Sequence, residues 1–269
     1  MMKKINDIAF SQSFAIQRQV IGALLMREIL TRYGRHNIGF LWLFVEPMVF
    51  TVGVTALWSI LKANSFHGLD IPITAFAVTG YSSVLMWRNT VSYVSHSLTP
   101  NLSLLHHRNV RVIDVYFSRI LLEITGVTIS FVFLSLFFTI VGWMRLPEDM
   151  FKVIVGWFML AWFGSSLSLV VGTLSERSEL VEKIWHPLSY LLFPLSGAAF
   201  MVDWLPPAAQ KIILLLPMVH GLELLREGFF GVNVVRTYYD IPYMAFVCLC
   251  LTFAGLAMIR DVVKNIGQE

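Results

Sequence analysis

The sequence REILTRYGRHNIGFLWLFVEP, from Arg27 to Pro47, joins a basic amphipathic segment directly to an apolar one. At helical spacing the apolar side holds Leu25, Met26, Ile29, Leu30 and Tyr33, and the charged side holds Arg27, Glu28, Thr31, Arg32 and Arg35. This division suits a helix that lies in a membrane interface. From Ile38 onward the chain is apolar and aromatic for the roughly 20 residues that a bilayer core of about 30 Å requires. The pattern predicts an amphipathic interface helix within residues 1–37 that leads into a first transmembrane helix.

The composition of the whole chain indicates a membrane protein. Hydrophobic residues make up 57% of the 269 residues and charged residues 14%, and the mean hydropathy is +0.70. That length accommodates about six spans with their connections, and the alternation typical of a β-barrel is absent. We therefore expect an all-α polytopic membrane protein in which residues 38–269 form a single domain. Cys248 and Cys250 lie in an apolar run and are expected to act as small hydrophobic residues.

Six apolar stretches mark the expected spans. They cover residues 38–61, 73–93, 117–143, 151–174, 184–201 and 241–259. Pro147 and two acidic residues in the turn after the third stretch are expected to stop a helix. The fifth stretch contains Pro187, Pro194 and Gly197, so we expect an interrupted helix there.

Lysine and arginine residues collect on one side of these spans. That side contains Lys3, Lys4, Arg18, Arg27, Arg32, Arg35, Arg88, Arg108, Arg111, Arg119, Arg177, Lys183, Arg260 and Lys264, and the other contains Lys62, Arg145, Lys152, Lys211, Arg226 and Arg236. Because cytoplasmic loops carry the excess of basic residues, both termini are predicted to be cytoplasmic. The start of the chain lacks the apolar core of a signal peptide, so the spans are expected to direct insertion.

The segment 198–240, between the fifth and sixth stretches, is too apolar for an ordinary loop. Pro206, Pro207 and Pro217 divide it into helical pieces of about 10 residues, each too short to cross a bilayer. A re-entrant helix pair over 204–230, entering from the outer face, satisfies these limits. The alternative is a pair of amphipathic helices that lie on the outer surface.

Several stretches, taken in order, resemble ABC-2 type permeases, most closely the capsular polysaccharide export permeases of the KpsM type. The stretches are residues 27–47, GYSSVLMW at 80–87, SLTPNLSLLHHRNV at 97–110 and LPMVHGLELLREGFFG at 216–231. The resemblance implies a homodimer of two six-helix subunits with a P-loop ABC ATPase under each. It also implies export of a lipid-linked polysaccharide across the bacterial inner membrane, together with periplasmic and outer-membrane export proteins. A nucleic-acid partner is not expected.

The sequence indicates that energy comes from a partner chain. No Gly-Lys pair followed by Ser or Thr occurs, so the phosphate-binding loop of an ATPase is missing. A gradient-driven carrier usually has ionisable residues deep in its spans and inverted repeats, and neither is evident here. We therefore expect a non-catalytic subunit with no cofactor of its own, and ATP and Mg on the partner ATPase.

Two groups of residues are candidates for a substrate path. Aromatic rings in the first two spans could stack on sugar rings, although rings at these places also serve as interface belts and core packing. Arginines near the inner face could attract an acidic or phosphorylated substrate, although they also satisfy the positive-inside rule. The path candidates are Arg27, Arg32, Tyr33, Arg35, Trp42, Phe50, Tyr81, Trp87, Arg88 and Tyr93.

A third group is expected to act as a gate or hinge. It consists of Glu46, Pro47, Pro206, Pro217, His220 and Glu223. Glu46 is costly inside a span, and the adjoining proline frees a carbonyl and bends the helix. Ser196, His220 and Glu223 could in principle form a catalytic set, but no signature of a hydrolase accompanies them. We expect no catalytic residues.

The stretch 96–112 separates the second and third spans on the predicted cytoplasmic side. Thr99 and Pro100 form a helix start, and the apolar residues after them have no span to shelter them. This ridge suits a short helix that docks in a groove of the ATPase, and a helix that floats on lipid is the alternative. The expected ATPase-coupling residues are Leu102, Leu105, His106, His107, Arg108 and Arg111. Adjacent histidines diverge on a helix, so a metal site at His106 and His107 is not expected.

The predicted function is therefore that of the membrane subunit of an exporter for lipid-linked capsular polysaccharide. Within transport, the alternatives are an ABC-2 permease for O-antigen, teichoic acid or a small hydrophobic compound. From another class, an integral membrane hydrolase or glycosyltransferase is the alternative.

Overall fold

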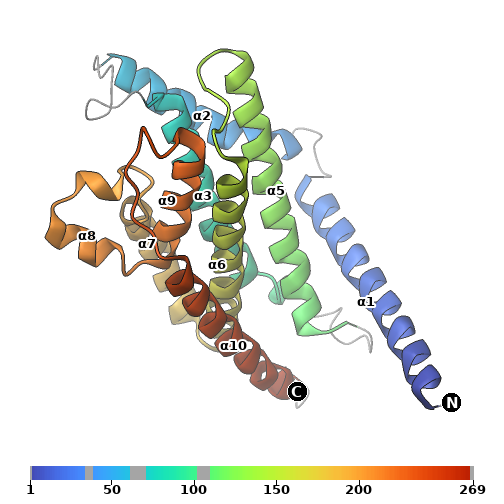
Figure 1. Cartoon of the computed structure of the whole chain (residues 1–269). Helices are drawn as coiled ribbons and strands as arrows, with labels where there is room; N and C mark the ends of the chain where they lie inside the picture. Colours follow the sequence, from blue (N-terminus) through green and yellow to red (C-terminus); the bar gives the residue numbers. More distant parts are fainter. Residues whose placement is uncertain (1, 34–38, 61–70, 102–109, 267–269) are drawn as a thin grey trace.

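A computed structural model describes residues 2–33, 39–60, 71–101 and 110–266 of the chain. Within these ranges the secondary structure is entirely helical (Figure 1). The α-helices are α1 (Met2–Tyr33), α2 (Gly39–Ile60), α3 (Ile73–Ser95), α5 (Val112–Ile140), α6 (Met150–Arg177), α7 (Glu179–Leu195), α8 (Pro207–Ile213), α9 (Pro217–Phe230) and α10 (Ile241–Ile266). Two 3-10 turns, η1 (Thr99–Asn101) and η2 (Val202–Trp204), complete these ranges. The all-α class is confirmed.

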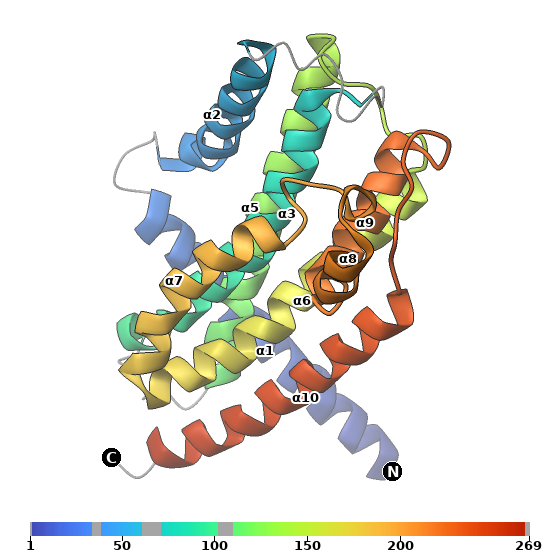
Figure 2. The same ribbon diagram turned by 90° about the vertical axis from the view of Figure 1, so that its left-hand side faces the viewer.

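Helix α6 forms the centre of the bundle and packs against α3, α9 and α10 (Figure 2). Small residues allow these close crossings. A β carbon on Gly164 would lie 3.0 Å from the Cα atom of Trp87 in α3, and one on Gly156 would lie 2.8 Å from the backbone nitrogen of Leu225 in α9. Glycines at such crossings bring helix backbones together, which is a common basis of helix packing in membranes. Helices α3 and α9 are thereby held against the same central helix.

Three described helices are long and apolar enough to cross a membrane: α5, α6 and α10. The pair α8 and α9, which is bent by 108°, could add a fourth span. The predicted count of six is therefore only partly matched. Helix α3 falls short in hydropathy because it carries buried hydroxyl residues, such as Thr79 and Ser83, which donate to carbonyls of their own helix. A helix enclosed by others does not need the apolar surface that lipid demands.

Several boundaries differ from the predicted spans. The stretch 184–201, predicted as the fifth span, contains most of the helix α7, which begins at Glu179 because Glu179 and Glu182 suit a first turn. It ends at Leu195, just before Gly197 with φ +85°. The third span ends at Ile140, before Gly142 with φ +83°, so this glycine stops the helix in advance of Pro147. Asp149 in the same connection instead begins α6, because its carboxylate accepts from the backbone nitrogens of Phe151 and Lys152.

Helix α1 lies at the edge of the bundle and runs diagonally past α5 (Figure 1). Its apolar residues Met26, Ile29 and Leu30 are exposed, whereas Arg27 and Glu28 bind groups on the rest of the protein. The first turn of α1 and the last turn of α10 lie at the same end of the molecule (Figure 1). The α5–α6 connection and the end of α9 lie at the opposite end, which we call the distal end.

Candidate functional site

Three rings from three helices meet beside a cavity. Phe50 of α2 stacks on Tyr81 of α3 with a centroid separation of 3.9 Å. Phe193 of α7 stands edge-on to both rings, at 6.2 Å from Phe50 and 6.3 Å from Tyr81. We call these three residues the aromatic cluster. The Tyr81 hydroxyl donates to Glu46 Oε1 at 3.3 Å, so an acidic group adjoins the rings.

The aromatic cluster lines the cavity together with Val54, Phe76, Ala77, Ala198 and Ala199. Ring faces beside a carboxylate offer apolar contact and a hydrogen-bond acceptor in one place, which is the chemistry that sugar rings use. Phe50, Tyr81 and Glu46 were all candidates from the sequence. Phe193 was missed, because the prolines of α7 obscured the helical spacing that would have assigned it to this face.

Four other path candidates, Trp42, Trp87, Arg88 and Tyr93, do not line this cavity. Trp87 is buried, only 1% exposed, and packs edge-on to Trp185 of α7 at 6.4 Å. The guanidinium of Arg88 lies 4.5 Å from the centre of the Tyr190 ring, which attaches α3 to α7. Trp42 and Tyr93 are 62% and 37% exposed. On a single subunit, Phe50 and Tyr81 are the described candidates that line this cavity.

Acidic and imidazole groups on α9 bind the extended segment that follows it. His220 Nδ1 accepts from the backbone nitrogen of Asp240 at 2.8 Å, and Glu223 Oε2 accepts from that of Tyr238 at 3.2 Å. Glu227 accepts hydrogen bonds from the hydroxyls of Thr237 and Tyr239, and its carboxylate lies 2.6 Å from Lys152 Nζ. Burial and the Glu227 charge raise the pKa of Tyr239. Residues 237–240 therefore run back along α9 as one attached unit.

Arg226 fixes α9 to the turn after α7. Its guanidinium is fully buried and donates to the carbonyls of Gly197, Ala198 and Phe200 at 2.7 to 2.8 Å. Glu223 binds the same region, since its Oε1 accepts from the backbone nitrogen of Val202 at 3.3 Å. From the sequence, Arg226 was predicted only to be one of the charges on the outer side. Its spacing of three residues from Glu223 was the available signal, because that spacing puts both on one helical face.

The bend between α8 and α9 has a side-chain support. Pro206 precedes α8, and Pro217 is the first residue of α9, where a proline needs no hydrogen-bond partner. His220 Nε2 lies 2.8 Å from the carbonyl oxygen of Leu214 in the bend, so the ring donates there and accepts at Nδ1. The Ser196 hydroxyl donates to the Phe193 carbonyl at 2.7 Å. The groups of the hypothetical catalytic set are therefore each engaged in backbone contacts.

Groups of α1 contact the start of the expected coupling segment. Arg27 donates to the Asn101 side chain and to the Pro100 carbonyl. Glu28 lies 2.6 Å from Arg119 of α5. Arg111, an exposed residue, caps the start of α5. Arg32 and Tyr33 belong to α1, but their side chains lie outside the described part. The candidates Arg35, Leu102, Leu105, His106, His107 and Arg108 lie outside the described residues.

Pro47 is buried inside α2, and the neighbouring Glu46 is exposed apart from its bond to Tyr81.

Within the described ranges, no group of three or more His, Cys, Asp or Glu residues is placed to hold a metal ion.

Comparison with known proteins gives a consistent result. The family model described as ABC-2 type transporter matches residues 19–230. The capsule polysaccharide export inner-membrane protein CtrC of Neisseria meningitidis serogroup B is 45% identical over 269 residues, which cover 100% of both chains. BexB of Haemophilus influenzae, which is also described as a capsule polysaccharide export inner-membrane protein, is 45% identical over 98% of both chains. The polysialic acid transport protein KpsM of Escherichia coli is 23% identical over 92% of this chain and 95% of its own length.

Proposed function

Because the chain belongs to the ABC-2 type transporter family, we propose that it is the membrane-spanning subunit of an exporter for capsular polysaccharide. The substrate is a lipid-linked polysaccharide that crosses the bacterial inner membrane, and ATP is hydrolysed by a separate P-loop ATPase. The observation that carries this proposal is the 45% identity, over the full length, to a protein described as a capsule polysaccharide export inner-membrane protein.

The working form is a homodimer in which the aromatic cluster lines the path of the glycan. Helix α7, which supplies one ring of the cluster, leaves Leu188, Tyr190 and Leu191 exposed at 42%, 63% and 62%. A second copy would cover such a surface and would place a second cluster opposite the first. Aromatic faces bind sugars mainly by apolar contact, so a polymer can advance past them without a tight binding site.

The α8–α9 pair acts as the gate at the distal end, which we assign to the periplasmic side by the positive-inside rule. Both termini are then cytoplasmic. The hydrogen bonds of α9 to residues 197–202 and 237–240 support movement of these parts as one body. Glu46 and Pro47 act as a hinge in α2.

The segment 96–112 is the coupling helix that docks on the ATPase. The bonds of Arg27 to Asn101 and Pro100 support this assignment, since they link α1 to the start of the segment. Two ATPase copies serve the dimer, and periplasmic and outer-membrane proteins receive the product. Arg32, Tyr33, Arg35 and Arg88 lie at the entry for the anionic end of the substrate.

A deletion strain tests the function directly. Without the gene, lipid-linked polysaccharide should accumulate in the cytoplasm and the surface capsule should disappear, and the plasmid-borne gene should restore both. Accumulation of an O-antigen or teichoic acid precursor would assign the permease to that substrate instead. Failure to synthesise any polymer would indicate a glycosyltransferase and contradict the proposal.

A further inference from the structure

An apolar groove runs between α5 and α6 over the half of these helices that adjoins the distal end. Val132 and Leu136 of α5 line one side, and Ile154 and Phe158 of α6 line the other. These four side chains are between 49% and 64% exposed. The groove exists because α5 packs mainly on α3, whereas α6 packs mainly on α3, α9 and α10. Neither helix fills the space beside the other.

The floor of the groove is closed by Trp157 of α6. Its ring stacks on Phe131 of α5 at 4.3 Å, and its indole nitrogen donates to Thr128 Oγ1 at 2.9 Å. The hydroxyls of Thr128 and Thr139, which also line the groove, donate to carbonyls of their own helix. These two threonines and Trp157 have their hydrogen bonds within the protein, and the Ser135 hydroxyl, which has no partner among the described residues, is buried beneath the surface. The groove therefore offers mainly hydrocarbon and ring surface.

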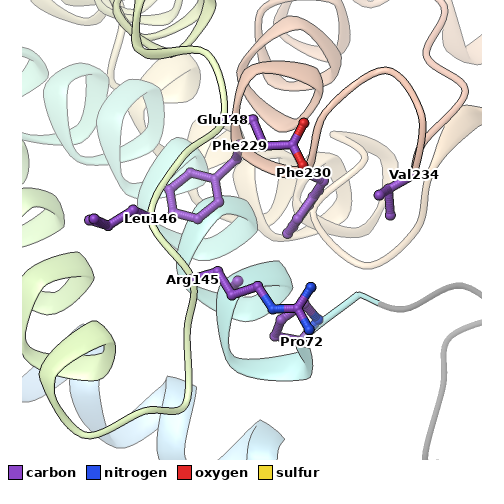
Figure 3. A pocket seen from close by; sticks show the side chains of 8 residues that line it. Pro72, Arg145, Leu146, Glu148, Phe229, Phe230 and Val234 are labelled. Carbon is purple, nitrogen blue, oxygen red and sulfur yellow. The ribbon is translucent and has the colours of Figure 1, made fainter.

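A pocket with two charged residues adjoins the distal end of this groove. Leu146 and Phe229 line both the groove and the pocket. Arg145 and Glu148 reach into the pocket from the connection between α5 and α6, and the Phe230 ring lies between them (Figure 3). The surface is therefore apolar along its length, with one positive and one negative group at one end.

The Glu148 carboxylate lies close to the backbone at Gly231. A β carbon on Gly231 would lie 1.8 Å from Glu148 Oε2, so a larger residue at position 231 would require the Glu148 carboxylate to move from the place it occupies. Gly231 also has φ +86°, a conformation that favours glycine. The negative group of the pocket thus lies against the end of α9.

We propose that the groove and the pocket together bind a glycerophospholipid whose headgroup carries a phosphate and a primary ammonium, as in phosphatidylethanolamine. One acyl chain lies in the groove, the phosphate faces Arg145 and the ammonium faces Glu148. Arginine matches the geometry of a phosphate, and a carboxylate matches the donors of an ammonium. A headgroup that is only anionic would face repulsion from Glu148.

The dimensions agree with an acyl chain. The lining residues of α5 extend from Ile124 to Thr139, which corresponds to roughly 22 Å of helix at 1.5 Å per residue. One leaflet contributes about 15 Å of hydrocarbon, half of the bilayer core. A bound chain would lie above the contact of Trp157 with Phe131, in the wedge that α5 and α6 leave open, and it would do so independently of the exported substrate.

The headgroup assignment is tested by native mass spectrometry of the full-length permease in detergent, titrated with phosphatidylethanolamine and with phosphatidylglycerol. The wild type should bind the former more tightly. Glu148→Gln and Arg145→Gln should each weaken that binding about tenfold, since one charge-assisted hydrogen bond is lost. Arg236→Gln, which changes an exposed arginine outside the pocket, should have no effect. Equal affinity for the two lipids, or unchanged affinity in both pocket variants, overturns the assignment.

The acyl-chain assignment needs a separate readout. Phosphatidylethanolamine with brominated chains should quench the fluorescence of Trp157, measured as the difference between the wild type and Trp157→Phe. Val132→Trp should block the groove and displace the lipid. Ile129→Trp, at a position of similar exposure on the same helix that does not line the groove, should leave it bound. The proposal is contradicted if both tryptophan variants lose bound lipid equally, if the lipid does not quench Trp157, or if a protein segment occupies the groove in place of lipid.

Discussion

The guanidinium carbon of Arg226 lies 3.8 Å from the centre of the Phe76 ring, which fixes α9 against α3 inside the protein. The same guanidinium binds carbonyls of the turn that follows α7. Phe76 and Ala198, two of the residues that this guanidinium contacts, also line the cavity beside the aromatic cluster. A displacement of α9 would therefore change the shape of that cavity, and one buried arginine connects the proposed gate to the proposed path.

Replacing Arg226 by lysine should destabilise the protein. A lysine ammonium lacks the planar fork that reaches several acceptors at once, so backbone carbonyls would be left without a donor. Each such buried carbonyl costs about 1–3 kcal/mol. Thermal unfolding of the purified protein should show a lower Tm for Arg226→Lys, whereas Arg236→Lys, at an exposed position, should match the wild type. Equal Tm values for the two variants would show that the arginine contacts are dispensable.

Gly231→Ala should destabilise the end of α9 for two separable reasons. The backbone at φ +86° and ψ 151° costs an L-residue roughly 1–3 kcal/mol, and the new methyl group would displace the Glu148 carboxylate from the place it occupies. The double variant Gly231→Ala, Glu148→Ala should recover the steric part and keep the conformational part. Its Tm should therefore lie between those of Gly231→Ala and Glu148→Ala. A double variant no more stable than Gly231→Ala would contradict the predicted collision.

Phe50→Ala should reduce export by removing the stacked partner of Tyr81. Phe50→Trp keeps an aromatic face and should retain most of the activity. Surface capsule, measured by flow cytometry with an anti-capsule antibody, provides the readout, and equal expression is checked by immunoblot. Phe246→Ala, which removes a 66% exposed ring from α10, serves as the control. Export that is equally impaired in Phe50→Ala and Phe246→Ala would remove the case for a path at the cluster.

Pro217→Ala should impair export without preventing insertion. The proline begins α9 directly after the 108° bend. Alanine at that position would allow α8 and α9 to join into a more continuous helix. Pro207→Ala alters the first residue of α8, away from the bend, and should export normally. Normal export by a stably inserted Pro217→Ala protein would exclude a gating role for the bend.

Leu105→Glu should weaken co-purification of the ATPase and abolish export. The expected coupling helix owes most of its affinity for the ATPase to a few apolar side chains. A charge in place of one of them opposes its burial in the docking groove of the ATPase. The control is Leu180→Glu, at a 63% exposed position in the first turn of α7. Retention of both the complex and export by the Leu105→Glu protein would overturn the coupling assignment.

Periodicity identified the existence and class of most elements. The six predicted stretches all contain helix, and the two short pieces bounded by prolines are α8 and α9. Observed helix ends differ from the predicted span ends where a residue begins or stops a helix regardless of hydropathy, as at Gly142 and in the acidic first turn of α7. Mean hydropathy does not mark α3 as a membrane-spanning helix, because many of its residues are buried among other helices and include hydroxyl groups. The predicted number of six spans therefore stays a prediction.

The sequence by itself determined that this is a helical membrane protein, because bilayer thickness and backbone hydrogen bonding leave few structures for so apolar a chain. The ABC-2 family followed from the resemblance of particular stretches, such as residues 27–47 and 216–231, and not from this physical argument. Only the tertiary structure decided that Phe193 joins Phe50 and Tyr81, that Arg226 serves three carbonyls, and that a groove opens between α5 and α6. These contacts join residues far apart in the chain. They depend on the rotation and crossing angle of packed helices, which arise from the fit of side-chain ridges into grooves and are not encoded in the spacing along any one helix.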